Sequence, residues 1–503
     1  MITAQPSTNQ IPKENLFARA PWLVALSALV GILPIWLSQY PPGVDFPQYA
    51  GQLYVIKHLI AQDPQYTVKY TLNWATPYWL GYILVTALAY MVSIVTAIKI
   101  ALVLEMWSTT YITYLILNEE GTDPRWAFLT VLFYFNMPFY FGFVNFLISI
   151  PLSLWVYLLV VRRSKNHNEG TAISLFVSML LLFSAHALTW AYILGLCFCR
   201  TMATDWNVKK TILRIWPLML TVPIALLWWV FTMHHANAEN AHQIYWGWGV
   251  YRFSQLPNIL LITHQTGFAW GVVAFIALVP LLSGFNYDVR AQKMLPFLYA
   301  AAMYGFAPHS FQNISFIQER FIVYIPLLLI FMIRFNATSV RAKVPHKLVT
   351  GAVYLILGMV VINNGIIFQG FNQETRNFQK IEAEIPAHSH VLSMEVDRFS
   401  RFLWAPVFLH FPVWLQAECG AQVDFSFASL FNEVVIYRHP SSIPFGFEWM
   451  PAWFDWKQLH GSEFDYFVAR FPVNPQNLLF KAEANKVIPV LHDGEWYLFK
   501  KKS

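Results

Sequence analysis

The chain of 503 residues is 57% hydrophobic, 17% aromatic and only 12% charged. Because soluble domains carry about 25% charged residues, this composition excludes an ordinary soluble protein and indicates a membrane protein with many spans. The net charge of +6 comes largely from basic residues in short loops between apolar runs, which is typical of membrane topology and not of nucleic-acid binding. The three cysteines encode neither a disulfide framework nor a zinc site.

The N-terminal part predicts one outward span and a long outer loop. Residues 1–20 are polar and carry Lys13 and Arg19, which predicts a cytoplasmic N-terminus. The first span, 21–39, then runs outward. It is long for a signal peptide and lacks a clear cleavage site, so we expect it to be retained. The loop 40–76 therefore lies outside.

The segment 43–49 (GVDFPQY) opens this loop and contains Asp45, the first acidic residue after the first span. An ionised carboxylate beside an apolar boundary is costly unless it has a partner or a function, so a functional role is the default. The alternative is a helix N-cap, because Pro47 occupies an early position of the helical pattern that follows. The two roles are compatible.

A helix lying in the interface plane is predicted behind Asp45. Apolar residues recur at steps of 4, 3 and 4 along one helical face, at Tyr49, Leu53, Ile56 and Ile60. Polar residues, at Gln48, Gln52 and Lys57, occupy the rest of the helix surface. This division of the surface is typical of an interfacial helix.

Residues 77–118 are mostly apolar and leave two topologies open. If both halves span the membrane, the loop 118–125 lies outside; if the first half is a re-entrant or interfacial hairpin, the loop lies inside. The second option is favoured because Arg162 and its basic neighbours, one apolar hairpin (126–161) later, should be cytoplasmic. The outer tip of that hairpin, 136–145, contains Pro, Gly and two Asn residues, which suit a break at a polar cavity.

Residues 171–199 lie between two basic loops and should therefore turn back within the membrane. The turn falls at 183–190, around His186, and leaves arms of about 13 residues or roughly 20 Å, shorter than the ~30 Å hydrocarbon thickness. His186 is then expected at the floor of an external cavity. The competing interpretation is a single long tilted helix, which would reverse the later topology and violate the charge bias.

The remaining apolar segments alternate between outer and inner loops. The predicted spans are 215–233, 269–284, 294–307, 321–335 and 348–368. The outer connections between them are 234–268 and 308–320.

Residues 370–503 lose the long apolar runs and carry acidic and basic residues at soluble density. Short candidate strands alternate with helical stretches, at 391–394, 464–469, 488–491 and 495–499. We interpret this part as a small extracytoplasmic α/β domain, since about 130 residues can bury a core of their own. The predicted fold is therefore mainly α: a transmembrane helical bundle (21–369) followed by this domain.

This topology places polar residues at the outer ends of the spans and only ordinary topology charges at the inner ends. The residues that gather there are Asp45, Asn136, Asn145, His186, His234, His235, Glu239, His309, Glu319 and Arg320.

Arg320 can hold a phosphate through its planar fork of donors, although snorkelling or an ion pair with Glu319 would also explain it. Three roles are open to His186: a metal ligand, a base or a satisfied core histidine. His234 and His235 are weak metal candidates, because adjacent side chains do not share a helix face.

The chain resembles the GT-C glycosyltransferases, multi-span enzymes that take sugars from polyprenyl-phosphate carriers. The resemblance covers most of the chain and rests on the acid just after an outward first span (Val44–Pro47) and the helix behind it. Similar bacterial proteins also share the Gly142–Phe146 segment, the Ser184–His186 hairpin, Glu319–Phe321 and an external C-terminal domain.

The resemblance implies a catalytic base or metal ligand at the first-loop acid and a basic residue on the lipid phosphate; these roles fall on Asp45 and Arg320. The first loop has no Asp-x-Asp motif, so a divalent metal stays open and no cofactor is assigned. The other candidates for phosphate or substrate contacts are His186, Glu319, His309 and Asn145. The resemblance further implies a polyprenyl-phosphate-linked sugar donor and an inverting reaction in the bacterial inner membrane, with an acceptor that is a glycan, a lipid or a protein.

Two other classes of protein stay open. A transporter or flippase of a lipid-linked saccharide predicts polar residues at the membrane midplane and repeated halves, whereas the chain shows no internal repeat. A non-catalytic envelope assembly protein predicts that Asp45 is dispensable and that 370–503 is essential.

Overall fold

The computed structural model describes most of the chain. The described ranges are 21–165, 169–235, 244–247, 249, 251–263, 265–311, 314–335, 345–424 and 426–502. Residues 1–20, Glu239 and the side chains of His234 and His235 lie outside the described part, so the predictions for them stay predictions.

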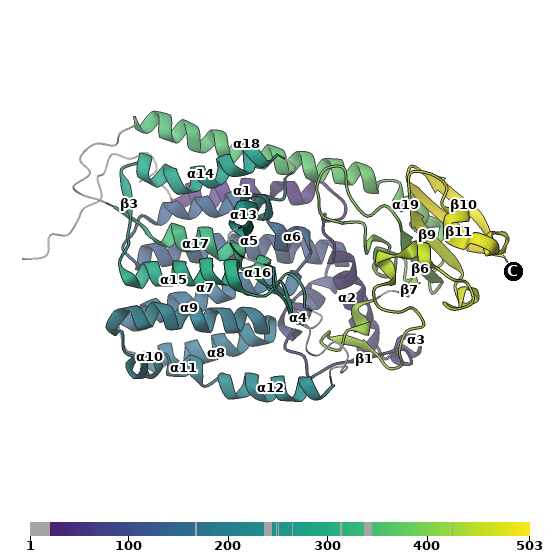
Figure 1. Cartoon of the computed structure of the whole chain (residues 1–503), viewed down its shortest axis with the longest axis horizontal. Helices are drawn as coiled ribbons and strands as arrows, with labels where there is room; N and C mark the ends of the chain where they lie inside the picture. The colour runs from purple at the N-terminus through teal and green to yellow at the C-terminus, as the bar shows by residue number, and fades with distance from the viewer. Residues whose placement is uncertain are drawn as a thin grey trace, which may run out of the picture.

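Long helices lie side by side and form a bundle, with a sheet-containing domain at one end (Figure 1). The α-helices of the bundle are, in chain order, α1 (Pro21–Ile32), α2 (Phe46–Ile60), α3 (Pro64–Thr67), α4 (Trp79–Ala89), α5 (Ile94–Glu119), α6 (Met137–Tyr140), α7 (Val144–Lys165), α8 (Glu169–Ala185), α9 (Ala187–Asp205), α10 (Val208–Arg214), α11 (Trp216–Met219), α12 (Val222–His235), α13 (Tyr251–Leu261), α14 (Thr266–Leu282), α15 (Ala291–Phe306), α16 (Ile317–Arg320), α17 (Tyr324–Phe331) and α18 (His346–Thr375). Three 3-10 segments interrupt them, η2 (Leu33–Trp36), η3 (Pro124–Phe133) and η4 (Phe321–Val323).

Within the described ranges, four helices are long and apolar enough to cross a membrane, and six do so if each of two bent pairs counts as one span. The four are Ile94–Glu119, Val144–Lys165, Ala187–Asp205 and Lys347–Glu384. The bent pairs join α10 to α11–α12, at 80°, and α13 to α14, at 93°. The expectation of a mainly helical chain with several membrane-length apolar helices is confirmed.

The segment 77–118 divides into a short α4 and a long α5. With 11 residues, α4 is only ~17 Å long, which is short of a membrane span. The carboxylate of Glu119, at the end of α5, pairs with Arg162 (3.3 Å) and Lys165 (3.0 Å) at the end of α7. The loop 118–125 therefore lies at the same end of the bundle as Arg162, as the fold-back topology requires.

The chain breaks at His186, as predicted, and α8 and α9 lie side by side (Figure 1). The competing single long helix is therefore wrong. The arms have 17 and 19 residues, longer than the expected 13, because both helices continue to the charged connections at their far ends.

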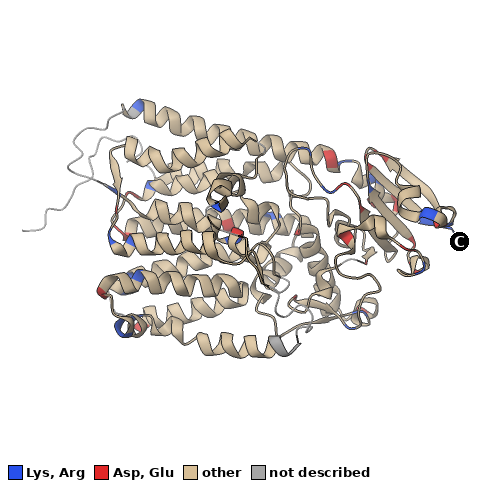
Figure 2. Cartoon of the chain, viewed as in Figure 1, with Lys and Arg blue, Asp and Glu red and all other residues tan. Residues whose placement is uncertain are grey.

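The basic residues gather at the bundle end away from the sheet, while the middle of the helices carries little charge (Figure 2). We call this the basic end. Glu120 there pairs with Arg200 (2.9 Å) and Lys293 (3.0 Å). Strands β3 (Phe285–Tyr287) and β5 (Ile333–Phe335) also pair antiparallel. The helical part of the predicted span 321–335 therefore ends earlier, at Phe331, because the chain pairs as a strand from Ile333 onward.

The C-terminal part contains a five-stranded sheet, which is the small sheet domain expected from the sequence. Its strand order is β10-β11-β9-β6-β7, with parallel pairing of β6 to β7 and β9 and antiparallel pairing elsewhere. The strands are β6 (His390–Glu395), β7 (Gln422–Val423), β9 (Tyr466–Arg470), β10 (Val487–Asp493) and β11 (Trp496–Lys501), and the α-helices are α19 (Phe378–Glu384), α20 (Trp414–Glu418) and α21 (Gln476–Phe480). Short 3-10 turns complete it, η5 (Phe411–Val413), η6 (Phe427–Ser429), η7 (Phe447–Trp449), η8 (Pro451–Trp453), η9 (Gly461–Glu463) and η10 (Lys481–Lys486).

The sheet domain is joined to the bundle through the first outer loop. Strand β1 (Tyr70–Leu72) of that loop pairs antiparallel with β8 (Val435–Tyr437), and α2 packs against α20, η5 and η6. Leu392 and Phe499 pack in a core of the domain's own, while Val391 and Val468 join the bundle core. The two hydrophobic cores therefore meet across the sheet.

The helix α2 exists as predicted, but it does not lie free in an interface plane. Gln48 and Gln52, expected on its surface, are buried. The Gln52 side chain accepts a hydrogen bond from the N–H of Val435 (3.0 Å), and Gln48 accepts one from the N–H of Phe427 (2.9 Å). The sequence could not show that Gln48 and Gln52 are buried, because the segment that covers them lies almost 400 residues later in the chain.

Candidate functional site

Asp45 is held in place by the hairpin tip that follows η3. The N–H of Asp45 donates to the carbonyl of Phe141 (3.2 Å). Gly142 has φ +75°, and a Cβ at that position would lie 2.6 Å from the backbone nitrogen of Phe46 and 2.8 Å from that of Asp45. Only glycine allows both the left-handed backbone and this close approach.

Asp45 occupies the N-cap position of α2, but its side chain makes no capping hydrogen bond. The capping interpretation is therefore wrong for the carboxylate, although the position in the helix was predicted correctly. The carboxylate lines a cavity of about 240 Å³, which we call the Asp45 cavity.

Four of the predicted site residues meet in the Asp45 cavity, although their positions span 45 to 320 in the chain. These residues are Asp45, Asn145, His186 and Arg320. The cavity is also lined by residues that sequence reasoning missed: Tyr49, Tyr78, Tyr82, His410, Glu433 and Trp449. The first three come from the outer loop and α4, and the last three come from the C-terminal part.

Arg320 has no carboxylate partner in ion-pair contact among the described residues. Its guanidinium donates to the carbonyl of Ser315 (3.2 Å) and lies 3.8 Å from the ring centre of Phe143. Glu319 pairs instead with His309 (2.7 Å). The ion pair between neighbours that offered a purely structural explanation of Arg320 is therefore absent.

His186 faces Arg320 across the cavity. Its Nδ1 lies at the N-cap of α9, 2.9 Å from Oγ1 and 3.2 Å from the backbone nitrogen of Thr189. A guanidinium can only donate, so Nε2 of His186 accepts the hydrogen bond from Nη1 of Arg320 (3.3 Å). His186 therefore orients Arg320, whose donors are suited to a negatively charged oxygen.

Two carboxyl groups of the cavity have raised pKa values. Burial raises the pKa of Asp45 to about 8; Arg320 opposes this rise, and the nearby charges of Glu433 and Glu448 add to it. Burial also raises the pKa of Glu433 to about 7, against the hydrogen bond from Tyr82 (3.2 Å). Both groups therefore titrate near neutral pH, where a carboxyl group can accept a proton from a hydroxyl group.

His410 lies beside Asp45, with Nε2 3.6 Å from a carboxylate oxygen. Burial lowers the pKa of His410 to about 3, so the imidazole is neutral and does not act as a counter-ion. Asp45 thus keeps a raised pKa in spite of the neighbouring ring.

Glu433 enters the cavity on a loop that the first outer loop holds. Nδ2 of Asn73 donates to the carbonyls of Phe431 (2.9 Å) and Glu433 (3.0 Å), and Oγ1 of Thr76 donates to the carbonyl of Asn432 (2.6 Å). No motif in the sequence distinguishes Glu433 from the other acids after residue 370. Its role is visible only because this loop folds back onto 70–76.

Several buried polar atoms of the cavity lack a hydrogen-bond partner in the described part of the chain. They are Oδ1 of Asn145, the hydroxyl of Tyr49 and Nε of Arg320. Unsatisfied buried polar atoms are costly, and a bound polar ligand would supply their partners. The cavity therefore has the chemistry of a binding site for a molecule with both hydroxyl groups and negative charge.

Three other predicted residues lie outside the cavity. Glu319 and His309 pair with each other and do not line it within the described ranges. Asn136 accepts a hydrogen bond from the N–H of Phe139 (3.1 Å) and caps α6, so its side chain has a structural role. In the part of the chain that the structure describes, no group of three or more His, Cys, Asp or Glu residues is placed to hold a metal ion.

No protein-family model and no curated protein matches the chain. Among solved structures, it is similar to the arabinofuranosyltransferase AftD from Mycobacteria, a cryo-EM structure of a mutant, with a TM-score of 0.52 and 10% sequence identity. The match covers 96% of this chain and 42% of the AftD chain. The chain has a GT-C-like fold. At this identity the similarity shows the fold alone, and the chain spans less than half the length of AftD.

Proposed function

We propose that the protein is a membrane glycosyltransferase that moves a sugar from a polyprenyl-phosphate carrier to an acceptor hydroxyl group. The observation that carries the proposal is that Asp45, a carboxyl group with a pKa of about 8, and Arg320, a cation without a carboxylate partner among the described residues, line one cavity. The GT-C-like fold supports it, since the similar AftD is an arabinofuranosyltransferase.

In this reaction Asp45 is the general base. It removes the proton from the acceptor hydroxyl group as the oxygen forms a bond to the anomeric carbon of the donor. The bond from that carbon to the phosphate oxygen breaks, and its electron pair stays on the phosphate. A single displacement of this kind inverts the anomeric centre.

Arg320 binds the leaving phosphate. Nη1 of Arg320 donates to Nε2 of His186 (3.3 Å), which orients the guanidinium, and its Nε has no hydrogen-bond partner among the described residues. Negative charge develops on the phosphate oxygen as the sugar departs, and positioned donors stabilise such charge strongly in a cavity shielded from water. Asn145, whose Oδ1 is buried without a partner, accepts a hydrogen bond from a donor sugar hydroxyl group.

The charge distribution supports an orientation with the basic end in the cytoplasm. The Asp45 cavity then opens on the extracytoplasmic side, where residues 370–503 form the outer domain that completes it. In a bacterial cell this arrangement corresponds to the inner membrane, with the outer domain in the periplasm.

Substitution Asp45→Asn tests the proposal. The purified protein in proteoliposomes is supplied with a radiolabelled polyprenyl-phosphate sugar and a membrane extract as the acceptor source. We expect transfer to fall by about 100-fold or more, the range for loss of a general base, with no loss of melting temperature.

Asp63→Asn is the matched control. Asp63 is also an acid of the first outer loop, but it caps α3 and pairs with His58 away from the cavity. Asn is an equally good cap, so this variant should retain full transfer. A fully active Asp45→Asn protein would contradict the base role, and movement of the intact lipid-linked sugar without transfer would identify a flippase instead.

A further inference from the structure

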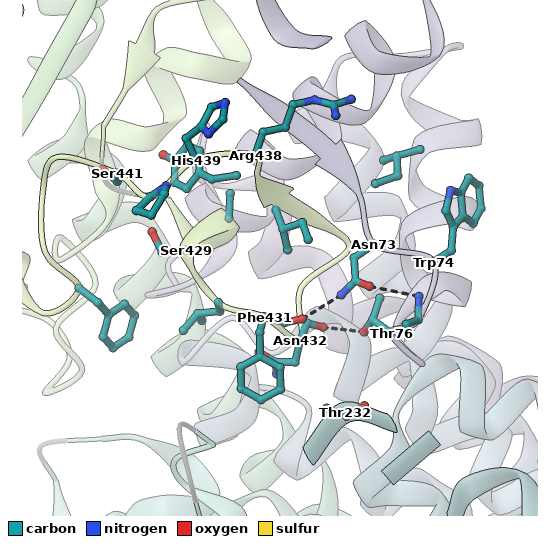
Figure 3. Close-up of a pocket in the computed structure, with 18 of the residues that line it drawn as sticks. Asn73, Trp74, Thr76, Thr232, Ser429, Phe431, Asn432, Arg438, His439 and Ser441 are labelled. Atoms are coloured by element: carbon teal, nitrogen blue, oxygen red, sulfur yellow. Dashed lines mark hydrogen bonds between the residues drawn. The ribbon is translucent and has the colours of Figure 1, made fainter. Parts of the chain in front are cut away.

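A second and larger cleft of about 890 Å³ adjoins the Asp45 cavity. It lies between the outer loop after β1, the end of α12 and the segment 428–445 of the C-terminal part, and Figure 3 shows the residues that line it. We call it the lateral cleft. Asp45, Asn145, His186 and Arg320 do not line this cleft.

The lateral cleft and the Asp45 cavity share one wall. Leu430, Asn432 and Phe445 line both. The hydrogen bonds from Asn73 and Thr76 hold this wall from the cleft side, as Figure 3 shows. The cleft and the Asp45 cavity are therefore neighbours on the two sides of these residues.

The lining of the cleft combines exposed aromatic rings with short uncharged polar side chains. Trp74 is 75% exposed, Phe445 57% and Phe231 53%. One face of Trp74 stacks on Trp79, with ring centres 4.5 Å apart, which keeps the ring orientation fixed and leaves the other face open. Such large exposed rings in a concave surface indicate a contact site for a ligand.

The polar lining includes Ser429, Asn432 and Thr232, and no acidic residue lines the cleft among those the structure describes. Arg438 and His439 also line the cleft, and Nε of Arg438 donates to the carbonyls of Thr67 (2.7 Å) and Tyr70 (3.1 Å). The cleft therefore offers apolar ring faces together with hydrogen-bond donors and acceptors, and no acidic group among the described residues.

We propose that the lateral cleft binds the acceptor as an oligosaccharide, which rests on the proposed glycosyl transfer. The C–H faces of sugar rings pack on aromatic side chains, while sugar hydroxyl groups exchange hydrogen bonds with amide and hydroxyl groups. A volume of about 890 Å³ lies within the range that encloses ligands of several rings. The terminal hydroxyl group of the oligosaccharide then reaches Asp45.

The test measures binding separately from turnover. Uncharged tetrasaccharides, an α-glucan and an arabinan series, are titrated onto the full-length protein in nanodiscs and followed by saturation-transfer NMR. The Asp45→Asn background removes turnover and leaves the cleft intact. We expect at least one series to bind, and Trp74→Ala to weaken that binding by about tenfold, the loss of one well-packed aromatic contact.

Trp453→Ala is the matched control, since Trp453 is 70% exposed and lines neither the cleft nor the Asp45 cavity. Phe231→Ala is the second cleft variant, to be used if Trp74→Ala does not fold, since Phe231 lines the cleft and not the Asp45 cavity. In the active protein, the cleft variants should raise KM for a binding tetrasaccharide about tenfold and change kcat less than twofold. Hydrolysis of the lipid-linked donor in the absence of acceptor should stay unchanged.

The proposal is overturned if no tetrasaccharide binds, if binding is equal in both cleft variants and the control, or if phospholipid headgroups displace the sugar. These outcomes differ from failure of the glycosyl-transfer proposal. If the glycosyl-transfer proposal fails, the Asp45→Asn protein transfers sugar normally. Saccharide binding in the cleft is measured without transfer and so is tested independently.

Discussion

Two buried polar clusters lie at opposite ends of the helical bundle, and they differ in how their charges are paired. At the basic end, Glu120 contacts both Arg200 (2.9 Å) and Lys293 (3.0 Å). At the other end, Arg320 contacts a neutral imidazole, a backbone carbonyl and an aromatic ring. The acids near it, Asp45 and Glu433, have only neutral partners within contact.

This difference separates a structural role from a binding role. A buried charge that is paired and hydrogen-bonded can be maintained by the fold alone, whereas an unpaired one is costly. The cluster at the basic end satisfies its own charges and holds the ends of α5, α9 and α15 together. The cluster around Arg320 does not, and a ligand that brings a phosphate would complete it.

The largest expected effect comes from exchanging one charge in each cluster. Arg320→Gln should lower sugar transfer by about 100-fold or more, since loss of one donor to a developing oxyanion has this effect, while the melting temperature changes little. Glu120→Gln should lower the melting temperature and leave transfer by the folded protein unchanged. It leaves two buried cations without their counter-ion, which costs about 3–5 kcal/mol of stability.

Both variants are measured by transfer in proteoliposomes and by thermal unfolding of the solubilised protein. If Arg320→Gln unfolds as readily as Glu120→Gln and the folded fraction stays active, the distinction between the two clusters fails.

A smaller effect is expected from the glycine that positions Asp45. Gly142→Ala should cost about 1–2 kcal/mol for a left-handed backbone and should also push the chain away from the nitrogens of Asp45 and Phe46. Transfer should fall by about tenfold, because small displacements of a catalytic group are costly. Thermal unfolding and transfer rates check both parts.

Gly121→Ala is the matched control. Gly121 has a similar φ of +69°, but a Cβ there meets nothing within 4 Å. This variant should show the stability loss alone. Equal activity of the two variants would show that Gly142 does not position Asp45.

The smallest expected effect is a change in pH dependence. Transfer requires the deprotonated form of Asp45, so the rate should rise with pH through about 8. The charge of Glu433 contributes to the raised pKa of Asp45, and Glu433→Gln removes it. The midpoint of the pH profile should therefore move to lower pH, by on the order of one unit or less.

The stability of the protein should show the same raised pKa. A carboxyl group whose pKa rises from 3.8 to about 8 on folding contributes stability at low pH that is lost as the pH rises through 8. Asp45→Asn should remove this dependence. If Glu433→Gln does not move the midpoint of the pH profile of transfer, the carboxyl groups of Asp45 and Glu433 do not interact.

Much of the fold was predictable from local sequence. The apolar runs predicted most membrane-length helices, and charge bias placed 118–125 beside Arg162. The turn at His186 followed from the basic loops on both sides of 171–199, which require both ends of this segment to lie on the same side of the membrane. The position of Asp45 before α2 was also visible, because Pro47 and the apolar spacing mark a helix start.

The site was predictable only in part. Asp45, Asn145, His186 and Arg320 each lie at a break in an apolar run, so topology alone brought them to one end of the bundle. Glu433 and His410 gave no such signal, since acids and histidines are common in a segment of soluble composition. The burial of Gln48 and Gln52 was missed because their partners lie in a distant part of the chain.

The sequence by itself determined the helical bundle, the separation of basic loops from polar breaks, and the residues that open the first outer loop. These features depend on hydropathy and on spacing along the chain, which are local properties. Only the tertiary structure decided that Arg320 lacks an acidic partner within the described residues, that His186 faces it, and that Glu433 raises the pKa of Asp45. These relations depend on distances between remote segments, which neither composition nor periodicity contains.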